Sequence, residues 1–378
     1  MNSTQAQSVC ATSAVALVGM ISTAHAHPPD LQANLERSWT QYITTFIQDD
    51  GRVIDRGAGD ISTSEGQAYA MLRAAWSDDR ATFERVRGWS IRNLQRGKSS
   101  NLPAWRWGQR PDGKWGTLDG QPASDSDQLM AFALLIAAER WSEPTYRTDA
   151  VALLHTIWDQ ETRVVGGRRM ILAGPWAMEQ DPVQVNPSYL MPFAYRAFAK
   201  ADAEHDWNSL VDSSYDLLER TTTAYGLPPD WAWVDATTGE IVAPPGSQTH
   251  MLSFGYDAFR APWNLAAEVQ WHDETRARVL LARMSPLGTM WRRDGRLPAK
   301  IAPGGEAAAE HDYLGMYGAL LPAWHHSRPG DAHTLYKTQI EPSDSLGVWG
   351  RPDDYYAQNW VWFGLALWTG LATPPEVL

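Results

Sequence analysis

Apolar residues recur at helical spacing along almost the whole chain from Leu31 onward, and this pattern constrains the fold more than any other feature of the sequence. Between residues 129 and 141, for example, Leu129, Phe132 and Ile136 fall on one helix face. The pattern predicts an all-α protein with about a dozen helical segments. These cover residues 31–47, 65–76, 82–94, 129–141, 146–158, 189–198, 207–222, 256–270, 273–284, 306–324, 332–339 and 355–371.

The connections between these segments predict how the helices are arranged. Three loops, at residues 96–122, 164–187 and 226–253, are rich in Gly, Pro and Trp and longer than a plain bundle requires. Connections lengthen where they build a site, so we expect a toroid of helices with one elaborated face. The sequence has no short repeat of the ankyrin or tetratricopeptide kind, which favours a closed ring over an open solenoid. Residues 52–55 and 240–243 are expected to form minor strands.

The first 26 residues have the pattern of a secretory signal peptide. A short apolar run at 14–21 precedes the small-x-small sequence Ala24-His25-Ala26. We therefore expect residues 1–26 to be removed, residues 27–378 to form a single catalytic domain, and the protein to be periplasmic or secreted. The only cysteine, Cys10, lies in this segment, so the mature chain is expected to have no disulfide and no Cys-ligated metal.

Charge and composition restrict the class of ligand. The formal net charge is -12, which disfavours nucleic acid and anionic lipid as partners. No later segment approaches the roughly 18 uninterrupted apolar residues of a membrane span. The chain has 20 Trp beside only 8 Phe, and indole faces are surfaces on which sugar rings stack. A neutral or cationic ligand is therefore favoured, although most of these Trp residues are expected to be core filler.

Glu65 stands at the start of a predicted helix, in the sequence Thr63-Ser64-Glu65-Gly66-Gln67. A Glu in this position is usually a cap that complements the helix dipole, and Ser64 and Gln67 have capping-box spacing. However, other residues are available for capping, and Gly66 weakens the helix while it allows a ligand or backbone to approach closely. Glu65 is thus a candidate catalytic acid.

A second acidic group, Asp125 and Asp127, precedes the apolar helix at 129–141. Capping accounts for one of them, but two carboxylates this close repel each other, a cost that functional sites accept. A metal would need further ligands. The histidines form no HExxH or comparable spacing, and we expect no metal and no cofactor.

The third acid is Asp257, which follows Tyr256 and has Arg260 three residues on. A structural ion pair is the simplest interpretation of Asp257 and Arg260. The chain has no GxSxG elbow, P-loop or dinucleotide fingerprint. Carboxylates and aromatic residues therefore remain as the side chains that could catalyse a reaction or bind a substrate. Two carboxyl groups, one protonated and one ionised, are what glycoside hydrolysis requires. Loop tryptophans are candidate sugar platforms, with loop packing as the alternative at each: Trp105, Trp107, Trp176 and Trp231.

These motifs resemble, in order and context, those of glycoside hydrolase family 8. The residues that carry the resemblance are Ser64-Glu65-Gly66-Gln67-x-Tyr69, Ala123-Ser124-Asp125-x-Asp127 and Tyr256-Asp257-Ala258-x-Arg260. Supporting segments look like those of endoglucanases that accompany bacterial cellulose synthesis: Gly51 to Asp55, Asn186 to Tyr189, Pro228 to Trp231 and Asp354 to Tyr356. Ser126 departs from the family's usual Gly or Ala at that position.

The resemblance implies an (α/α)6 barrel with a substrate groove at one end, and inverting hydrolysis of internal β-1,4-glucosidic bonds. Glu65 matches the proton donor and Asp257 the catalytic base, whereas Asp125 matches an acid described as a second catalytic residue. Substrate contacts are expected from Asp127, Tyr189, Tyr256, Arg260 and the loop tryptophans. The implied ligand is a β-1,4-glucan such as cellulose or cello-oligosaccharides, with a possible association with a cellulose synthase complex.

Two alternatives stay open at the level of sequence. The first is a chitosanase or xylanase of the same family, since a cationic sugar also suits an acidic groove. The second is a glycan-binding protein without catalytic activity.

Overall fold

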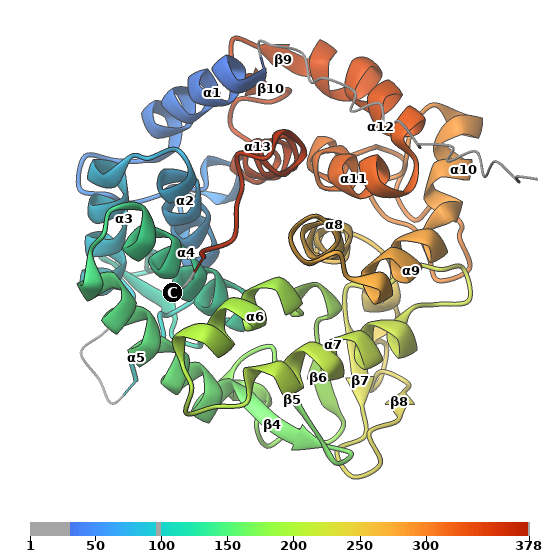
Figure 1. Cartoon of the computed structure of the whole chain (residues 1–378), viewed down its shortest axis with the longest axis horizontal. Helices are drawn as coiled ribbons and strands as arrows, with labels where there is room; N and C mark the ends of the chain where they lie inside the picture. The colour runs from blue at the N-terminus through green and yellow to red at the C-terminus, as the bar shows by residue number, and fades with distance from the viewer. Residues whose placement is uncertain (1–30, 96–99, 377–378) are drawn as a thin grey trace, which may run out of the picture.

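The computed structural model describes residues 31–95 and 100–376, which form a ring of helices (Figure 1). The expected export segment 1–26, including Cys10, lies outside the described residues. The helices are α1 (Leu31–Phe46), α2 (Ser64–Trp76), α3 (Arg80–Asn93), α4 (Ser124–Arg140), α5 (Pro144–Glu161), α6 (Pro192–Ala201), α7 (Trp207–Thr221), α8 (Arg260–His272), α9 (Thr275–Arg283), α10 (Ser285–Asp294), α11 (Leu314–Ser327), α12 (Pro329–Leu335) and α13 (Tyr355–Thr369).

Helices α2, α4, α6, α8, α11 and α13 form the inner wall of the ring, and each contacts the next along the chain. Most inner helices are buried on nearly all sides, and α13 shows this from Trp360 to Trp368. Helix α6 is the exception, because one of its sides is partly exposed. The ring is closed, because Arg73 of α2 donates to Asn359 of α13 at 3.2 Å. The predicted all-α toroid is confirmed.

Two glycines allow α11 and α13 to pack with their backbones in close contact. A Cβ added to Gly364 would lie 1.9 Å from the carbonyl oxygen of Gly318, and one added to Gly318 would lie 2.5 Å from that of Trp360. Both positions therefore require glycine because any side chain would force the two inner helices apart.

The largest differences from the predicted helices occur in two places. The helix predicted over 306–324 begins only at Leu314, because the preceding backbone folds back on the start of the same connection from α10: Ile301 bridges Ala307, and Ala299 N–H donates to the carbonyl of His311. Helix α10 was not predicted, since Pro286 and Gly288 interrupt its periodic pattern. Pro286 lies in the first turn, where a missing N–H costs no hydrogen bond.

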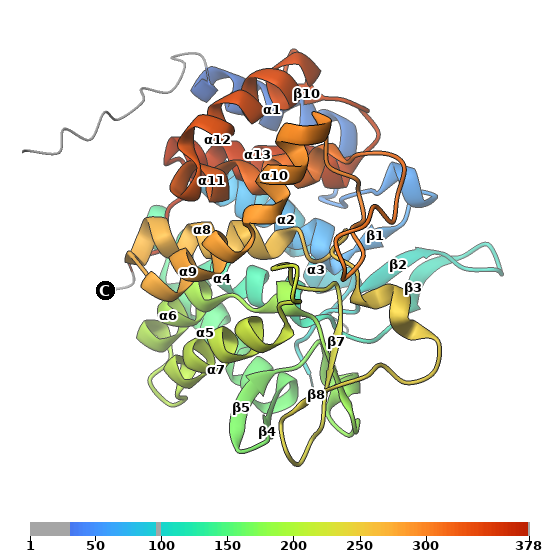
Figure 2. The same cartoon turned by 90° about the vertical axis from the view of Figure 1, so that its right-hand side faces the viewer.

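Short antiparallel strands occupy the long loops. They are β1 (Ser62–Thr63), β2 (Arg106–Gln109), β3 (Trp115–Asp119), β4 (Thr162–Val165), β5 (Arg168–Ile171), β6 (Val183–Val185), β7 (Ala232–Val234), β8 (Ile241–Val242), β9 (Asp344–Ser345) and β10 (Val348–Trp349). Figure 2 shows β2, β3 and β7 on the same side of the ring. The expected strand at 240–243 contains β8, whereas 52–55 forms only isolated bridges, from Val53 to Ile47 and from Asp55 to Ile61.

Among the described residues, no helix combines the length and the apolar character needed to cross a bilayer.

Candidate active site

The inner helices present their N-terminal ends to one region of the ring. Glu65 is the second residue of α2, Asp125 the second of α4, and Arg260 and Tyr355 are the first of α8 and α13. Residues that are far apart in sequence therefore meet because these helices run in the same direction. Each N-terminus also carries partial positive charge that favours a carboxylate nearby.

The side chain of Arg260 joins all three predicted acids. Its Nη1 donates to Glu65 Oε2 at 3.0 Å and to Asp125 Oδ2 at 3.0 Å, and its Nη2 donates to Asp257 Oδ1. The structure thus brings together the three carboxylates that the sequence singled out, and Arg260 binds more than the single Asp257 partner expected for it. A planar guanidinium with several donors suits this role.

The three carboxyl groups differ in their access to solvent. The side chain of Asp125 is 6% exposed, that of Glu65 22% and that of Asp257 31%. Burial raises the pKa of Glu65 to about 7, and the neighbouring Asp125 and Asp257 charges add to this against the opposing effect of Arg260. Burial also raises the pKa of Asp125. Glu65 can therefore carry a proton near neutral pH while a more exposed carboxylate faces water.

Two residues that hold this cluster were not assigned a role from the sequence. The Tyr355 hydroxyl donates to Glu65 Oε1 at 2.8 Å. Arg260 Nε donates at 3.1 Å to the hydroxyl of Ser188, which itself donates to Asn186. Both Tyr355 and Ser188 belong to the supporting segments of the family resemblance. That resemblance is the feature of the sequence that could have identified them as site residues.

Asp230 was missed in the same way, and it fixes the loop that carries Asp257. Its Oδ1 accepts hydrogen bonds from the backbone N–H groups of Gly255, Asp257 and Ala258 at 3.0, 3.1 and 2.8 Å. A Cβ on Gly255 would lie 2.6 Å from Asp230 Oδ2, so only glycine fits this approach. The position of Asp257 is thus set by backbone contacts to a buried acid.

The capping box predicted from Ser64 and Gln67 at the start of α2 is wrong. Thr63, not Ser64, caps α2 by accepting from Gly66 N–H at 3.0 Å. The Gln67 side chain reaches away from the cap and accepts from Val53 N–H. At α4 the cap residue is Ala123, which makes no side-chain cap bond, whereas Asp125 accepts from Ser126 N–H in the first turn at 2.8 Å. Tertiary contacts therefore outcompete the local capping box.

Ser64 and Ser126 instead bind each other across the two helix starts. Ser126 donates to the carbonyl of Ala123 at 2.8 Å, so the Ser64 hydroxyl is the donor in its 2.7 Å bond to Ser126. Both serines are buried. The residue that departs from the family pattern thus ties the helix start bearing Glu65 to the one bearing Asp125.

Asp127 lies apart from the Arg260 cluster. It is fully buried, and burial together with the charge of Glu161, the last residue of α5, raises its pKa well above its ordinary value. Burial raises the pKa of Glu161 to about 8. Both buried carboxyl groups therefore favour the protonated form. Asp127 therefore packs between helices.

An aromatic row extends from Arg260 along the loops. The guanidinium lies 5.1 Å from the centre of the Tyr189 ring, which lies 5.9 Å from Trp231, and Trp231 lies 6.4 Å from Trp176. All three rings are partly exposed. Three predicted substrate contacts thus form a continuous surface beside the acids.

The β2–β3 hairpin places two further predicted tryptophans differently. The Trp105 carbonyl accepts from Ser64 N–H at 3.0 Å, which puts Trp105 beside the start of α2. Trp107 packs edge-on against Trp89, stacks on Trp115 at 5.3 Å and receives the guanidinium of Arg52 at 4.6 Å. Trp115, not selected from the sequence, is the exposed ring of this group.

Tyr256 stands on the far side of Asp257. It is 38% exposed, contacts the Tyr313 ring at 5.0 Å, and its hydroxyl lies 3.0 Å from His311 Nε2. It is an accessible aromatic residue next to the third acid.

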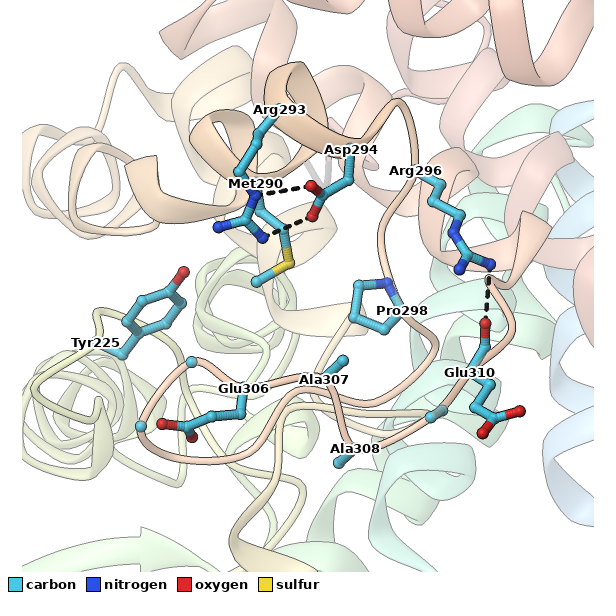
Figure 3. A pocket seen from close by; sticks show the side chains of 13 residues that line it. Tyr225, Met290, Arg293, Asp294, Arg296, Pro298, Glu306, Ala307, Ala308 and Glu310 are labelled. Carbon is cyan, nitrogen blue, oxygen red and sulfur yellow. Dashed lines mark hydrogen bonds and ion pairs between the residues drawn. The ribbon is translucent and has the colours of Figure 1, made fainter.

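A separate surface hollow of about 1260 Å³ lies beside the C-terminal end of α10 (Figure 3). Arg293 and Asp294 form two hydrogen bonds to each other there, and Tyr225 lines the hollow beside them. The hollow shares no lining residue with the Arg260 cluster.

The model of glycosyl hydrolases family 8 matches residues 8–328. The chain belongs to this family. A family 8 relative from Salmonella typhi, named endoglucanase, is 35% identical over 289 residues, which cover 75% of this chain and 76% of that protein. The predicted resemblance is confirmed, and the chain is a glycoside hydrolase.

Solved structures agree with the family 8 assignment. The endo-1,4-D-glucanase from Vibrio fischeri ES114 superposes with a TM-score of 0.72 at 27% identity, covering 88% of this chain and 94% of that one. Rex8A from Paenibacillus barcinonensis, solved with xylose, superposes with a TM-score of 0.75 at 22% identity, covering 92% and 94%, and shows the shared fold alone. The fold of this chain is the (α/α)6 barrel of the family.

Proposed function

We propose that this family 8 enzyme is an endo-1,4-β-glucanase that hydrolyses internal bonds of a neutral β-1,4-glucan with inversion. The observation that carries the proposal is the set of three acids joined by Arg260, among which the pKa of Glu65 is raised to about 7 while Asp257 remains the most exposed. An acid that keeps its proton and a carboxylate that reaches water are the two groups that the inverting reaction needs.

In the proposed reaction, protonated Glu65 gives its proton to the glycosidic oxygen as the bond to the anomeric carbon breaks. Asp257 takes a proton from a water molecule, whose oxygen attacks that carbon from the opposite face. One bond to oxygen is broken and one is formed, and the configuration inverts. The two carboxyl groups are then expected to lie roughly 6.5 to 9.5 Å apart with substrate bound.

Asp257 rather than Asp125 is proposed as the base. The side chain of Asp257 is 31% exposed against 6% for Asp125, so a water molecule reaches it more readily. Asp125 is held by Arg260 and by Ser126 N–H. We assign it to orienting the sugar in the cleaved subsite.

The aromatic row of Tyr189, Trp231 and Trp176 is proposed as the sugar-binding platform. These rings are partly exposed and lead away from Arg260, so a chain stacked on them would present a linkage to the acids. Trp105 and Tyr256 extend the groove on its other sides. Trp107 is a weaker platform because neighbouring side chains already cover its ring. Asp127 is not proposed to touch the sugar, and it acts through the packing of α4.

The names of the relatives support glucan as the substrate, since both the Salmonella typhi protein and the Vibrio fischeri protein are glucanases by name. The test is reducing-sugar release from carboxymethylcellulose, chitosan and xylan side by side, with Glu65→Gln as the inactive control. We expect the cellulosic substrate to be cleaved fastest, with a rapid fall in viscosity. A clear preference for chitosan or xylan would overturn the substrate assignment, and absence of hydrolysis on all three would favour a glycan-binding role.

We also propose that the enzyme is exported, with residues 1–26 removed, and that it acts alongside cellulose synthesis. The apolar run at 14–21 and the Ala24-His25-Ala26 sequence support export. N-terminal sequencing of the protein from periplasm or medium should begin at His27. Co-purification with a cellulose synthase complex would test the association.

A further inference from the structure

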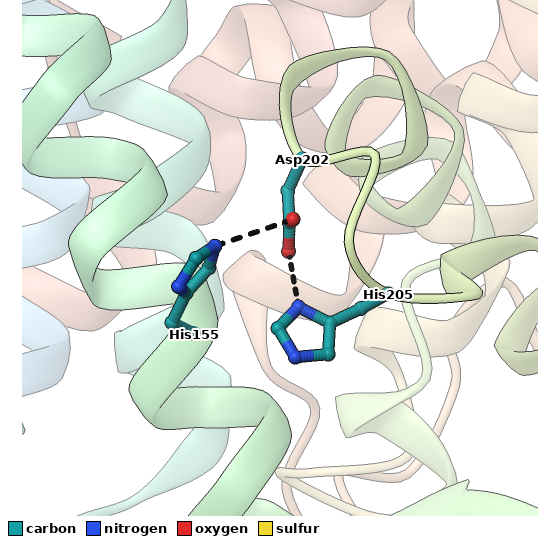
Figure 4. A group of neighbouring side chains, drawn as sticks. All are labelled: His155, Asp202 and His205. Carbon is teal, nitrogen blue, oxygen red and sulfur yellow. Dashed lines mark hydrogen bonds and ion pairs between the residues drawn. The ribbon is translucent and has the colours of Figure 1, made fainter.

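His155, Asp202 and His205 form a compact group on the outer layer of the ring (Figure 4). His155 comes from the middle of α5, Asp202 directly follows α6, and His205 lies in the connection to α7. One ligand atom from each residue lies within 4.8 Å of the others. The group is distant from the acids, because α6 begins next to the Ser188 segment and its ten residues span about 15 Å.

Asp202 holds one imidazole of the group by a hydrogen bond and has the second at a longer distance. His205 Nδ1 lies 2.7 Å from Asp202 Oδ2. His155 Nε2 lies 3.3 Å from Asp202 Oδ1 but makes no hydrogen bond there, although this nitrogen atom is shielded from solvent. Ligand atoms of a tetrahedral zinc site, with bonds of about 2.0–2.1 Å, stand about 3.4 Å apart. The unpaired imidazole nitrogen is therefore at ligand spacing from a carboxylate oxygen.

The surroundings already fix the carboxylate and one ring. Asp202 accepts from the indole N–H of Trp207 at 2.9 Å and from Glu204 N–H at 3.0 Å. The Trp158 ring packs on His205 at 5.0 Å. Such second-layer contacts orient metal ligands in proteins, and here they hold Asp202 with its side chain only 1% exposed.

We propose that His155, Asp202 and His205 bind a divalent transition metal ion, with zinc as the ion of choice. Two imidazoles and one carboxylate suit zinc and disfavour calcium and magnesium, which prefer oxygen ligands. The His155 side chain is 36% exposed, which provides an entry path for an ion beside its ring. The bound ion clamps α5 to the connection between α6 and α7 and leaves the hydrolytic site untouched.

The test is a cobalt titration of tag-free, chelator-treated protein, because Co²⁺ in a site of this kind absorbs visible light. We expect saturation at one Co²⁺ per chain, displacement by Zn²⁺, and a thermal midpoint raised by several degrees at saturating Zn²⁺. His155→Gln and His205→Gln should each abolish the signal. His333→Gln, at an exposed position of α12, is the matched control and should retain it.

Glucan hydrolysis by both variants should stay within about twofold of the wild type, since the acids lie at the opposite end of α6. A failed glucanase assay in the wild type would therefore not bear on the metal site. The proposal is overturned if the wild type shows no saturable Co²⁺ absorption, or if the absorption persists in the double variant His155→Gln/His205→Gln. In that case the three residues form a plain hydrogen-bonded group.

Discussion

At the scale of single residues, Arg260 explains how three carboxylates can be held close together. An uncompensated buried charge is costly, and carboxylates that share a site repel one another. Arg260 offsets both effects by donating to Glu65, Asp125 and Asp257 at once. At Glu65 the charge of Arg260 does not fully offset the effect of burial, so the pKa of this carboxyl is still raised to about 7. The raised pKa makes Glu65 suited to proton donation.

Replacing Glu65 with glutamine should abolish turnover and leave the fold intact. The amide keeps the shape and the Tyr355 contact but has no acidic proton, so we expect kcat to fall by about 10²–10⁴-fold or more. Reducing-sugar release and circular dichroism check this outcome. Glu84→Gln, on the exposed face of α3, is the matched control, and activity of Glu65→Gln near that of this control would reject the assignment.

Asp257→Asn and Asp125→Asn should respond differently to azide. If Asp257 activates water, a small anion in the space beside its amide can replace that water as nucleophile, and activity is partly restored. The buried Asp125 leaves no comparable path, so its variant should stay inactive. The measurement is the rate of aryl cellobioside cleavage against azide concentration, with the product anomer identified by NMR. Rescue of Asp125→Asn alone would exchange the two roles.

The pH profile should reflect the raised pKa of Glu65. Because the acid acts in its protonated form, kcat/KM is expected to fall as the pH rises above about 7, by tenfold per unit at the limit. The same shift means that the folded state binds more protons than the unfolded chain above pH 4.5, so this group's contribution to stability decreases as the pH rises through 7. A rate profile that is flat to pH 9 would contradict the assignment.

At the scale of elements, the acid pair Asp127 and Glu161 joins the start of α4 to the end of α5. The protonated forms avoid buried charge, but they make the contact dependent on pH. The pKa of Glu161 is raised to about 8, so the free energy of unfolding should fall as the pH rises from 4.5 through 8.

Glu161→Gln removes this titration, because its amide donates to Asp127 at any pH. The thermal midpoint of the variant should therefore decrease less than that of the wild type between about pH 6 and 9. Thermal melts by circular dichroism across this range provide the comparison, with Glu84→Gln as the exposed control. Parallel curves for variant and wild type would show that Glu161 does not titrate in this range.

At the scale of the whole molecule, net charge distinguishes the possible polymers. A protein of net charge -12 attracts a polycation over long range but exerts no such force on a neutral glucan. The KM for a neutral cello-oligosaccharide should change less than about twofold between roughly 20 and 300 mM salt, since screening acts only on charged partners. Steady-state kinetics at both salt concentrations measure this. A steep rise of KM with salt would point to binding that depends on charge.

The sequence predicted much of this fold and of the site, and its failures have local causes. Periodicity located most helices because inner and outer helices alike bury apolar faces. It failed at 306–313, where backbone bonds to the start of the same connection replaced helical hydrogen bonds. The Ser64 and Gln67 capping box was a sound local prediction that partners from other helices and loops displaced.

What the sequence alone determined is the chemical inventory: helical periodicity, loop tryptophans and acids in recognisable motifs. Only the tertiary structure decided which groups meet, because contacts such as Arg260 to Glu65 and Tyr355 to Glu65 join residues 195 and 290 positions apart. Only burial in the closed ring decided protonation, since the pKa of a carboxyl depends on the solvent and charges around it. Spacing along the chain carries no information about either.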